Sequence, residues 1–342
     1  MSTTVDETAA DEISPILLVE AMFAVRRTGA IKAAIELDLF TTLGPEGGSA
    51  QSVATALGAA ERGIRILCDC LVVNGFLTKA VDRYTPTLST IAFLDRRSPS
   101  YLGDAIEFIA APEMVRLFLD DPAAIVRNGG SVGLANISAD NPVWVKFARA
   151  MGPFTRGAAA GLAAEVAVMG EAPRKILDIA AGPGFFGIEM GKVFPAAEIV
   201  AVDWASVLSL SQEHAEEAGI ADRYRPLPGS AFDVDWGGDY DLVLLPNFLH
   251  HFDIDTCVNL LTKVRASLSA KGRVAGVEFV PNDDRISPPF PAAFSWEMLV
   301  TTPKGDAYTE KELAEMGRLA GFRSATVRPL PRTPASMFLL EP

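Results

Sequence analysis

The chain of 342 residues has only three cysteines, and its 30 basic residues are outnumbered by 43 acidic ones. Cys68 and Cys70 lie two positions apart on a predicted helix and Cys257 is isolated, so neither a disulfide framework nor a zinc-binding spacing is present. Such sparse cysteines are typical of a reducing compartment, and we expect a cytoplasmic protein. The net charge of −13 argues against sequence-independent nucleic-acid binding, which requires a basic surface.

Long apolar runs are also missing. No stretch of about 18 apolar residues occurs, so we expect no membrane-spanning helix and no membrane partner. Residues 1–14 are acidic and polar, without the apolar region of a secretory signal, and are expected to form a disordered tail. The remainder has a globular composition, with 49% hydrophobic and 21% charged residues overall, and its length predicts two domains.

Residues 15–97 have the periodicity of helices followed by a small β-hairpin. Ser49 is predicted to cap a helix that stops at Gly58, and Asn74-Gly75 is predicted to end the next helix. The segments 76–78 and 84–86 then flank a turn, as the strands of a wing would. This order of elements predicts a winged-helix arrangement, which is often used to bind DNA.

The third helix of this segment is not basic enough for a recognition helix. It carries Arg62 and Arg65, but also Glu61 and Asp69, and a helix that reads DNA needs a more basic face. We therefore interpret residues 15–97 as a dimerisation module. A ligand-sensing or DNA-binding protein that kept a cofactor fold remains an alternative.

Residues 98–170 are predicted to form a helical linker that is interrupted by prolines. One stripe of its last helix carries Trp144, Phe147, Ala148 and Met151. A stripe of aromatic residues and methionine at helical spacing is more often core than pocket.

Residues 171–342 alternate between short apolar strands and helices. Strands are expected at 175–179, 198–202, 242–245, 273–280, 324–329 and 337–340. This alternation predicts parallel βαβ units, and hence an α/β fold with a doubly wound sheet. In such a sheet ligands bind beyond the carboxyl ends of the strands, where we look for the site.

A glycine-rich turn, ILDIAAGPGFFG from Ile176 to Gly187, follows the first of these strands. Small residues there let a ligand lie against the backbone near a helix N-terminus. Asp203 ends the second strand, nineteen residues after Gly184, and can accept hydrogen bonds from both ribose hydroxyls. The glycines also spell GxGxxG, so a nicotinamide dinucleotide is an alternative. The acidic Asp178 favours a cationic ligand, S-adenosylmethionine, over a pyrophosphate.

The turn resembles the first motif of class I S-adenosylmethionine-dependent methyltransferases. The whole order of elements resembles the O-methyltransferase family of plant caffeate and acetylserotonin type and its bacterial natural-product relatives. Matching stretches are GAIKAAIELDLFTTL, LCDCLVVNGFLTK and LLPNFLHHFDIDTCVNLLTKVRASLSAKGRVAGVEF. The resemblance implies a Rossmann-like catalytic domain at 171–342, S-adenosylmethionine as cofactor, and a homodimer formed through the N-terminal domain.

The family pattern implies a set of cofactor-binding residues. Asp203 matches the ribose-binding acid, Ala180 stands where the family has its first glycine, and Ser230 stands where it has an acid near adenine. Pro246 occupies a position where many members carry lysine. The expected cofactor-binding residues are Asp178, Ala180, Gly182, Gly184, Asp203, Trp204, Ser230, Ala231, Phe232 and Asn247.

The resemblance also implies a general base. His250 matches the family's catalytic histidine, and Glu278 matches the acid that orients its ring; His251 takes the place of an aspartate. The family's third acid falls at Ala307, where Asp306 or Tyr308 is a possible substitute. A histidine is suited to take a proton from a hydroxyl near neutral pH. Packing at the strand end, or contact with the cofactor, is the alternative role for His250.

A metal site formed by His250, His251, Asp253 and Asp255 is another interpretation. Adjacent histidines rarely point at one ion, and the only other histidine is His214, so we expect no metal.

The expected acceptor is a small aromatic or polyketide-like molecule, methylated on oxygen, with nitrogen and carbon left open. The substrate pocket is expected to include Phe147, Met151, His251, Phe294 and Met298. Two other functions remain open: an NAD(P)-dependent oxidoreductase, and a family member that binds the cofactor but no longer transfers methyl.

Overall fold

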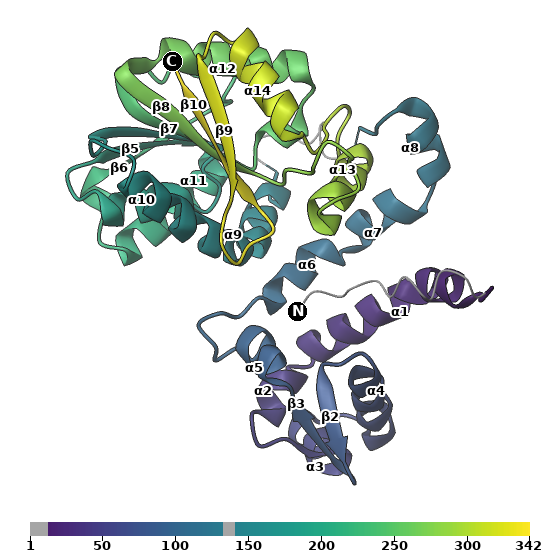
Figure 1. The fold of residues 1–342 in the computed structure, drawn as a ribbon. Coiled ribbons are helices and arrows are strands. Elements are labelled where there is room, and N and C mark those ends of the chain that lie inside the picture. Colours follow the sequence, from purple (N-terminus) through teal and green to yellow (C-terminus); the bar gives the residue numbers. More distant parts are fainter. Residues whose placement is uncertain (1–12, 133–140) are drawn as a thin grey trace. The chain divides into compact units, whose positions relative to one another are not determined.

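The computed structural model describes residues 13–132 and 141–342 (Figure 1). It contains two compact units, one up to Ala110 and the other from Ala111 onward. The boundary falls within the segment 98–170 that we expected to link the domains. Most of the expected tail, residues 1–12, and residues 133–140 of that linker lie outside the described residues.

The N-terminal unit is mainly helical and carries a three-stranded antiparallel sheet in the order β1-β3-β2. Its elements are α1 (Ile16–Glu36), α2 (Leu39–Leu43), β1 (Gly48–Ser49), α3 (Ala50–Leu57), α4 (Glu61–Val73), β2 (Leu77–Ala80), β3 (Arg83–Pro86), α5 (Leu88–Leu94), the 3₁₀ turn η2 (Gly103–Ala105) and α6 (Ile106–Ile109). The predicted helices and wing are thus confirmed.

Local signals explain these boundaries. The Ser49 hydroxyl accepts a hydrogen bond from the backbone N–H of Ser52 at 3.1 Å, which caps α3. Gly58 ends α3 with a left-handed backbone, φ 62°. On α4, Asp69 accepts hydrogen bonds from Lys79 at 2.6 Å and from Arg65 at 3.0 Å. Arg65 of α4 and Lys79 of the wing are therefore both paired with the carboxylate of Asp69.

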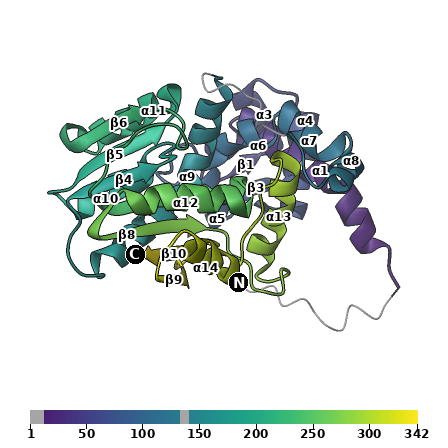
Figure 2. The same ribbon diagram turned by 90° about the horizontal axis from the view of Figure 1, so that it is seen from above.

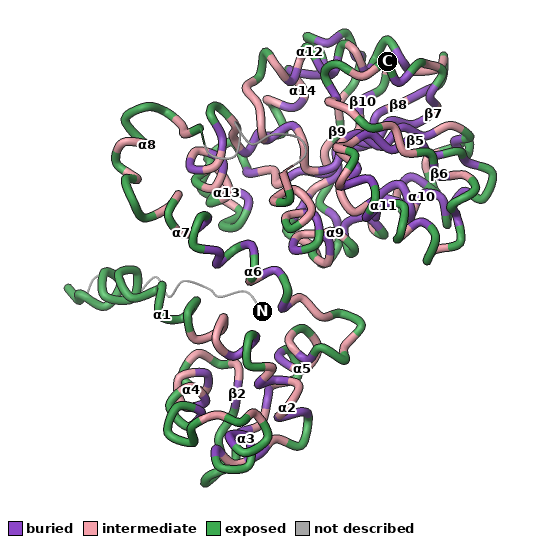
Figure 3. The backbone as a smooth tube through the Cα atoms, turned by 180° about the vertical axis from the view of Figure 1, so that it is seen from behind, coloured by how far each residue is buried: buried purple, intermediate pink, exposed green. Residues whose placement is uncertain are grey.

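The first half of α1 is exposed (Figure 3), and it carries many apolar side chains. Those more than a third exposed are Ile16, Leu17, Leu18, Val19, Met22, Phe23 and Val25. In contrast, Ala34 and Ile35 at the end of the helix are buried in the core of the unit. An apolar helix surface of this size is typical of an interface with another protein chain.

The C-terminal unit contains a seven-stranded sheet with helices on both faces. Its helices are α7 (Pro112–Leu119), α8 (Pro122–Asn128), α9 (Val143–Ala167), α10 (Phe185–Val193), α11 (Ala205–Glu217), α12 (Ile254–Ala266), α13 (Pro289–Thr301) and α14 (Glu310–Leu319), with 3₁₀ turns η3 (Ala221–Arg223) and η4 (Leu249–His251). Its strands are β4 (Lys175–Ile179), β5 (Glu198–Asp203), β6 (Tyr224–Pro228), β7 (Tyr240–Pro246), β8 (Leu268–Glu278), β9 (Ser324–Pro329) and β10 (Ser336–Glu341).

The strand order is β6-β5-β4-β7-β8-β10-β9, and β4 to β8 pair in parallel. The doubly wound α/β prediction is therefore confirmed, with two differences. Strand β6 was not expected, and β10 pairs antiparallel with both β8 and β9. The short connection from β9 to β10 explains the antiparallel pairing of these two strands, since a parallel neighbour needs a long crossover.

Two apolar layers enclose the sheet. Side chains of α9, α10 and α11 pack on one face, around Leu162, Phe186 and Leu208. Side chains of α12 and α14 pack on the other, around Leu260 and Met316, and Figure 2 shows α12 lying along this face. The central strands β4, β5 and β7 are mostly buried between these layers. None of the described helices is long and apolar enough to cross a membrane.

Candidate active site

The turn after β4 is shaped by backbone that few residues adopt. Gly184 and Gly187 sit too close to their neighbours for a side chain: a Cβ would lie 2.8 Å from the Tyr224 hydroxyl or from Asp178 Oδ2, respectively. Ala180, where the resembling family has glycine, nevertheless adopts a left-handed φ of 55°. The sequence thus builds a tight turn whose backbone is open to a ligand, at the cost of strain at Ala180.

Asp203, at the end of β5, is bound to this turn. Its Oδ2 accepts a hydrogen bond from Gly182 N at 2.8 Å and its Oδ1 accepts one from Trp204 N at 2.7 Å. Burial raises the pKa of Asp203, while these two N–H groups act in the opposite direction. The two strand ends predicted to meet at the site, those of β4 and β5, are therefore joined through one carboxylate.

Asp178 is fully buried near the end of β4. Its Oδ2 accepts a hydrogen bond from Gly187 N at 2.9 Å, whereas its Oδ1 has no partner in the described part of the chain. Burial raises the pKa of Asp178 to about 7, the Gly187 N–H lowers it and the charge of Asp203 raises it. A buried carboxylate oxygen without a donor costs free energy, so this position favours a cationic or hydrogen-bonding ligand nearby.

Asn247 presents a second unsatisfied acceptor, directly after β7. Its backbone is left-handed, φ 52°, and its N–H donates to Val277 O at 2.7 Å. Its buried side-chain oxygen Oδ1 has no partner within the described residues. Since β4 and β7 are neighbouring parallel strands, Asn247 and Asp178 offer acceptors at the same edge of the sheet. Such acceptors fit the positively charged amino group and sulfonium of S-adenosylmethionine.

The loop after β6 carries the three residues expected near adenine. Gly229 N donates to Asp203 O at 3.0 Å, which ties the loop to β5. The Ser230 hydroxyl accepts a hydrogen bond from Phe232 N at 3.1 Å, and Ala231 is buried. The Phe232 ring is 37% exposed and packs edge-on against Phe252 at 5.0 Å. The Phe232 ring is thus partly open to solvent in the loop expected to lie near adenine.

His250 and Glu278 form a buried pair. Strand β8 ends at Glu278 and η4 carries His250, and the two side chains are only 3% and 7% exposed. His250 Nδ1 lies 2.5 Å from Glu278 Oε2. A carboxylate accepts here, so we assign the proton to Nδ1, which leaves Nε2 as the basic nitrogen.

Aromatic rings surround His250. Phe294 of α13 packs edge-on against it at 5.0 Å and against Phe279 at 4.6 Å. The half-buried His251 ring lies 4.3 Å from that of His250. Burial, followed by the influence of His250, lowers the pKa of His251 well below its ordinary value, so this ring is neutral at physiological pH.

The position of the family's third acid is filled by Ala307, which is buried. Asp306 pairs with Arg285 at 3.0 Å, and Tyr308 donates its hydroxyl hydrogen to Phe252 O. The Asp306 backbone N–H donates to His250 O at 3.0 Å. Neither side chain hydrogen-bonds to the His250 ring, so His250 and Glu278 form a dyad.

The remaining predicted pocket residues come from α9 and α13. Phe147 and Met151 are half-buried on α9, and Ala148 between them packs against Val207 and Leu210 of α11. Met298 is buried on α13, one turn beyond Phe294. The structure therefore joins Phe294 to His250 directly and places the α9 residues beside α11.

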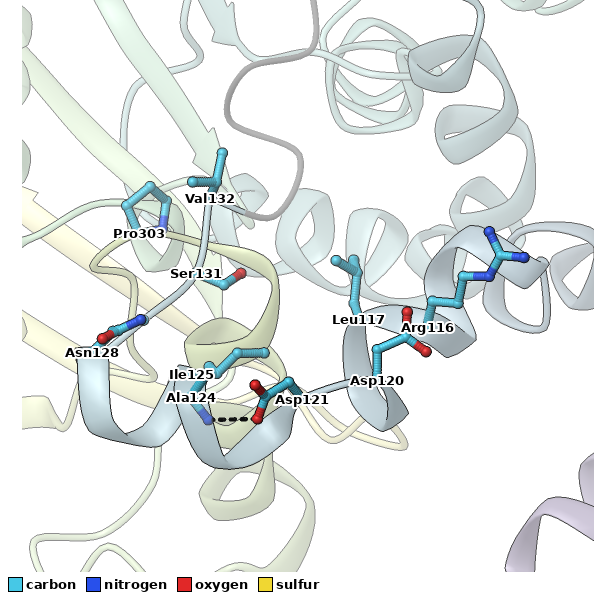
Figure 4. A pocket seen from close by; sticks show the side chains of 11 residues that line it. Arg116, Leu117, Asp120, Asp121, Ala124, Ile125, Asn128, Ser131, Val132 and Pro303 are labelled. Carbon is cyan, nitrogen blue, oxygen red and sulfur yellow. Dashed lines mark hydrogen bonds between the residues drawn. The ribbon is translucent and has the colours of Figure 1, made fainter.

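A cavity of about 610 Å³ lies elsewhere, along α7, α8 and the segment that follows α8 (Figure 4). Arg116, Asp120, Ile125 and Pro303 are among its lining residues, and none of the predicted site residues is. It is a feature of the helical hairpin, distinct from the strand-end site.

No group of three or more His, Cys, Asp or Glu side chains suited to a metal ion occurs within residues 13–132 and 141–342. His214 Nδ1 lies 2.8 Å from Pro183 O, and its ring stacks on Phe185 at 4.8 Å. The third histidine is therefore used in packing the glycine turn.

The sequence pattern does not single out Lys263, which contacts the loop after β6. Its partners are backbone carbonyl groups, so nothing in the sequence distinguishes it from other helical lysines.

Comparison with known proteins adds independent information. A family model of the O-methyltransferase domain matches residues 131–323, and one of the O-methyltransferase dimerisation domain matches residues 19–95. The chain is 28% identical to a 3-hydroxy-5-methyl-1-naphthoate 3-O-methyltransferase of Streptomyces sahachiroi, over 90% of this chain and 89% of that protein.

Solved structures agree with these matches. The crystal structure of a candidate O-methyltransferase from Nostoc punctiforme is 46% identical, with a TM-score of 0.92 over 96% of this chain and 99% of the other. Human N-acetylserotonin methyltransferase, crystallised with S-adenosylmethionine, shares the fold at 20% identity, with a TM-score of 0.81 over 100% and 99% of the two chains. These similarities favour neither the oxidoreductase nor the DNA-binding alternative.

Proposed function

The chain belongs to the O-methyltransferase family, and we propose that it transfers a methyl group from S-adenosylmethionine to a hydroxyl oxygen of a small aromatic or polyketide-like molecule. His250 is the general base of this reaction and Glu278 orients it. The observation that carries the proposal is the buried His250–Glu278 pair at the carboxyl edge of the sheet.

Residues of the glycine turn and its neighbours are suited to hold the cofactor. Asp203 keeps free lone pairs for the ribose hydroxyls after accepting from Gly182 and Trp204. Asp178 Oδ1 and Asn247 Oδ1 are acceptors that receive no hydrogen bond from residues 13–132 and 141–342, which suits a ligand with a positive end. When bound, S-adenosylmethionine supplies an electrophilic methyl group on a positively charged sulfur. Ser230, Ala231 and Phe232 would contact its adenine ring.

The dyad provides the proton acceptor. Glu278 holds the Nδ1–H of His250, so the lone pair of Nε2 is free to receive a hydroxyl proton. As the oxygen–carbon bond forms and the carbon–sulfur bond breaks, Nε2 takes this proton. Phe294 packs on the buried His250 ring and Phe279 packs on Phe294, so the base has apolar neighbours that limit the access of water during the in-line displacement.

The side chains near His250 and the name of one relative support this class of acceptor. Phe294, Phe279 and Met298 offer an apolar surface with aromatic faces beside the base. The Streptomyces sahachiroi relative is named for a hydroxylated naphthoate. We propose an acceptor of similar chemistry, a fused or substituted aromatic ring with a free hydroxyl. Phe147 and Met151 of α9 would contact this ring.

The assembly is proposed to be a homodimer formed by residues 15–97. The exposed apolar half of α1 and the match to a dimerisation domain support this assignment. Residues 98–170 then serve as linker and pocket wall, and residues 171–342 as catalytic domain. The free cysteines Cys68, Cys70 and Cys257 support a cytoplasmic location.

Isothermal titration calorimetry with S-adenosylhomocysteine and, separately, with NAD tests the cofactor. Binding of S-adenosylhomocysteine and no binding of NAD is the expected result. Tight NAD binding without S-adenosylhomocysteine binding would overturn the proposal. Binding of S-adenosylhomocysteine with no turnover on any aromatic hydroxyl would instead indicate a family member that has lost methyl transfer.

A further inference from the structure

Lys263 makes an unusual set of contacts. It projects from α12, and its Nζ donates hydrogen bonds to the backbone carbonyls of Val234 at 2.8 Å, Phe232 at 3.1 Å and Ala231 at 3.2 Å. All three acceptors belong to the loop after β6, about thirty residues earlier in the chain. One ammonium group thus uses all three of its donors on a single short loop.

The surroundings of Lys263 are apolar on one side and acidic on the other. Nζ lies 3.9 Å from the centre of the buried Trp236 ring, a cation–π contact. Burial lowers the pKa of Lys263, and Asp233 and Asp235 raise it in part. No carboxylate forms an ion pair with Lys263 within the described chain. The carbonyl groups are therefore its principal partners.

The loop after β6 also has backbone hydrogen bonds of its own. At its start, Gly229 N donates to Asp203 O, and the Ser230 carbonyl accepts from Asp233 N and Val234 N. These hydrogen bonds form a turn, and the carbonyl groups of Ala231, Phe232 and Val234 in this turn converge on Lys263. The side chains near the expected adenine position, Ala231 and Phe232, belong to the same residues whose carbonyls Lys263 binds.

Helix α12 also holds the catalytic turn. It begins directly after η4, and the Cys257 thiol donates to Leu249 O at 3.2 Å. Asp253 caps the helix by accepting from Thr256 N at 2.9 Å. Lys263 lies about two turns further along the same helix. One rigid helix therefore contacts both the turn that carries His250 and the loop that carries Phe232.

We propose that Lys263 is a positioning residue for cofactor binding: its ammonium group holds the loop 230–236 in the conformation that receives the adenine ring. The three converging carbonyl groups need donors, which the lysine ammonium group supplies and an apolar side chain of the same length does not. The inference rests on the proposed placement of adenine beside Ser230–Phe232. Loss of Lys263 should therefore weaken cofactor binding and leave the rate of the chemical step unchanged.

The test compares Lys263→Met, which keeps the length of the side chain and removes its donors, with Lys263→Arg, which keeps the charge. Lys271→Met serves as the matched control, because Lys271 is exposed and its partner is the equally exposed Glu171. Calorimetry with S-adenosylhomocysteine gives the dissociation constant of each variant. Hydrogen exchange of the ligand-free proteins reports on amides 230–236.

For Lys263→Met we expect the dissociation constant to rise about tenfold or more and the amides 230–236 to exchange faster. Lys263→Arg should recover most of the affinity, and Lys271→Met should match the wild type. Wild-type affinity and protection in Lys263→Met would overturn the inference. If Lys263→Met does not fold, an unchanged dissociation constant in Lys263→Ala, which also lacks a donor, would overturn it equally. Failure of the wild type to bind S-adenosylhomocysteine would instead refute the proposed function.

Discussion

Glu278 divides its two carboxylate oxygens between the side chain and the backbone of the turn that carries His250. Oε2 lies 2.5 Å from His250 Nδ1, while Oε1 accepts from the N–H groups of Phe248 at 3.1 Å and Leu249 at 2.9 Å. The same carboxylate therefore fixes both the position of the turn and the orientation of the imidazole ring. In the proposed mechanism, this arrangement orients His250 without the family's third acid.

Glu278→Gln is expected to lower kcat about tenfold or more, because the amide no longer stabilises the correct tautomer and the protonated ring. The dissociation constant of S-adenosylhomocysteine should change by less than about threefold. Steady-state kinetics and calorimetry measure the two effects separately. Glu171→Gln, at an exposed carboxylate, is the control. An unchanged kcat would show that Glu278 only stabilises the turn.

Asp203→Ala should act in the opposite way. It removes the carboxylate that binds the glycine turn and would bind the ribose, so we expect the dissociation constant of S-adenosylhomocysteine to rise about a hundredfold, as for the loss of charge-assisted hydrogen bonds. The exposed Asp222→Ala is a matched control. Calorimetry that finds the two variants equal in affinity would contradict the ribose-binding role.

Ala180 has a left-handed backbone that glycine adopts without strain. Ala180→Gly is therefore expected to leave the free energy of unfolding unchanged or to raise it by up to about 1 kcal/mol. The same change at the exposed helical residue Ala160 should cost about 1 kcal/mol. Urea unfolding measures the change in the free energy of unfolding for each variant. Equal destabilisation by the two changes would mean that Ala180 is not strained.

The buried Asp178 should make stability depend on pH. Its pKa is about 7 in the folded protein, above its ordinary value of 3.8. Between about pH 4 and pH 7 the folded chain therefore holds a proton that the unfolded chain has released, and stability falls as the pH rises through this range. Asp178→Asn should gain stability relative to the wild type as the pH rises from 4.5 to about 7. Urea unfolding at several pH values measures this difference, and a constant difference would contradict the shifted pKa.

Much of the fold follows from local patterns in the sequence. Ser49 and Gly58 mark the ends of α3, and the alternation of apolar strands and helices after residue 171 predicts the doubly wound sheet. Strand β6 escapes prediction because Pro226 and Pro228 lie within it, and prolines are tolerated only at a sheet edge such as this one. The reversal of β10 depends on pairing with β8, which no local pattern encodes.

Part of the site could also be predicted from the sequence, and part depends on contacts between residues far apart in the chain. The pairing of His250 with Glu278 is implied by the family pattern and is present in the structure. Sequence could not indicate that Asp306 would be paired with Arg285, or that Lys263 would bind carbonyls across the sheet edge. These contacts join residues far apart in the chain and leave no periodic signal.

The central claim is that His250 removes a proton from an acceptor hydroxyl while its oxygen receives the methyl group. Incubation with trideuteromethyl S-adenosylmethionine and a panel of hydroxylated naphthoates and polyketide phenols, followed by mass spectrometry, tests it most directly. We expect the label on oxygen, and a rate about a hundredfold lower for His250→Ala with unchanged binding of S-adenosylhomocysteine. Label on carbon or nitrogen, or a His250→Ala variant as fast as the wild type, would contradict the account.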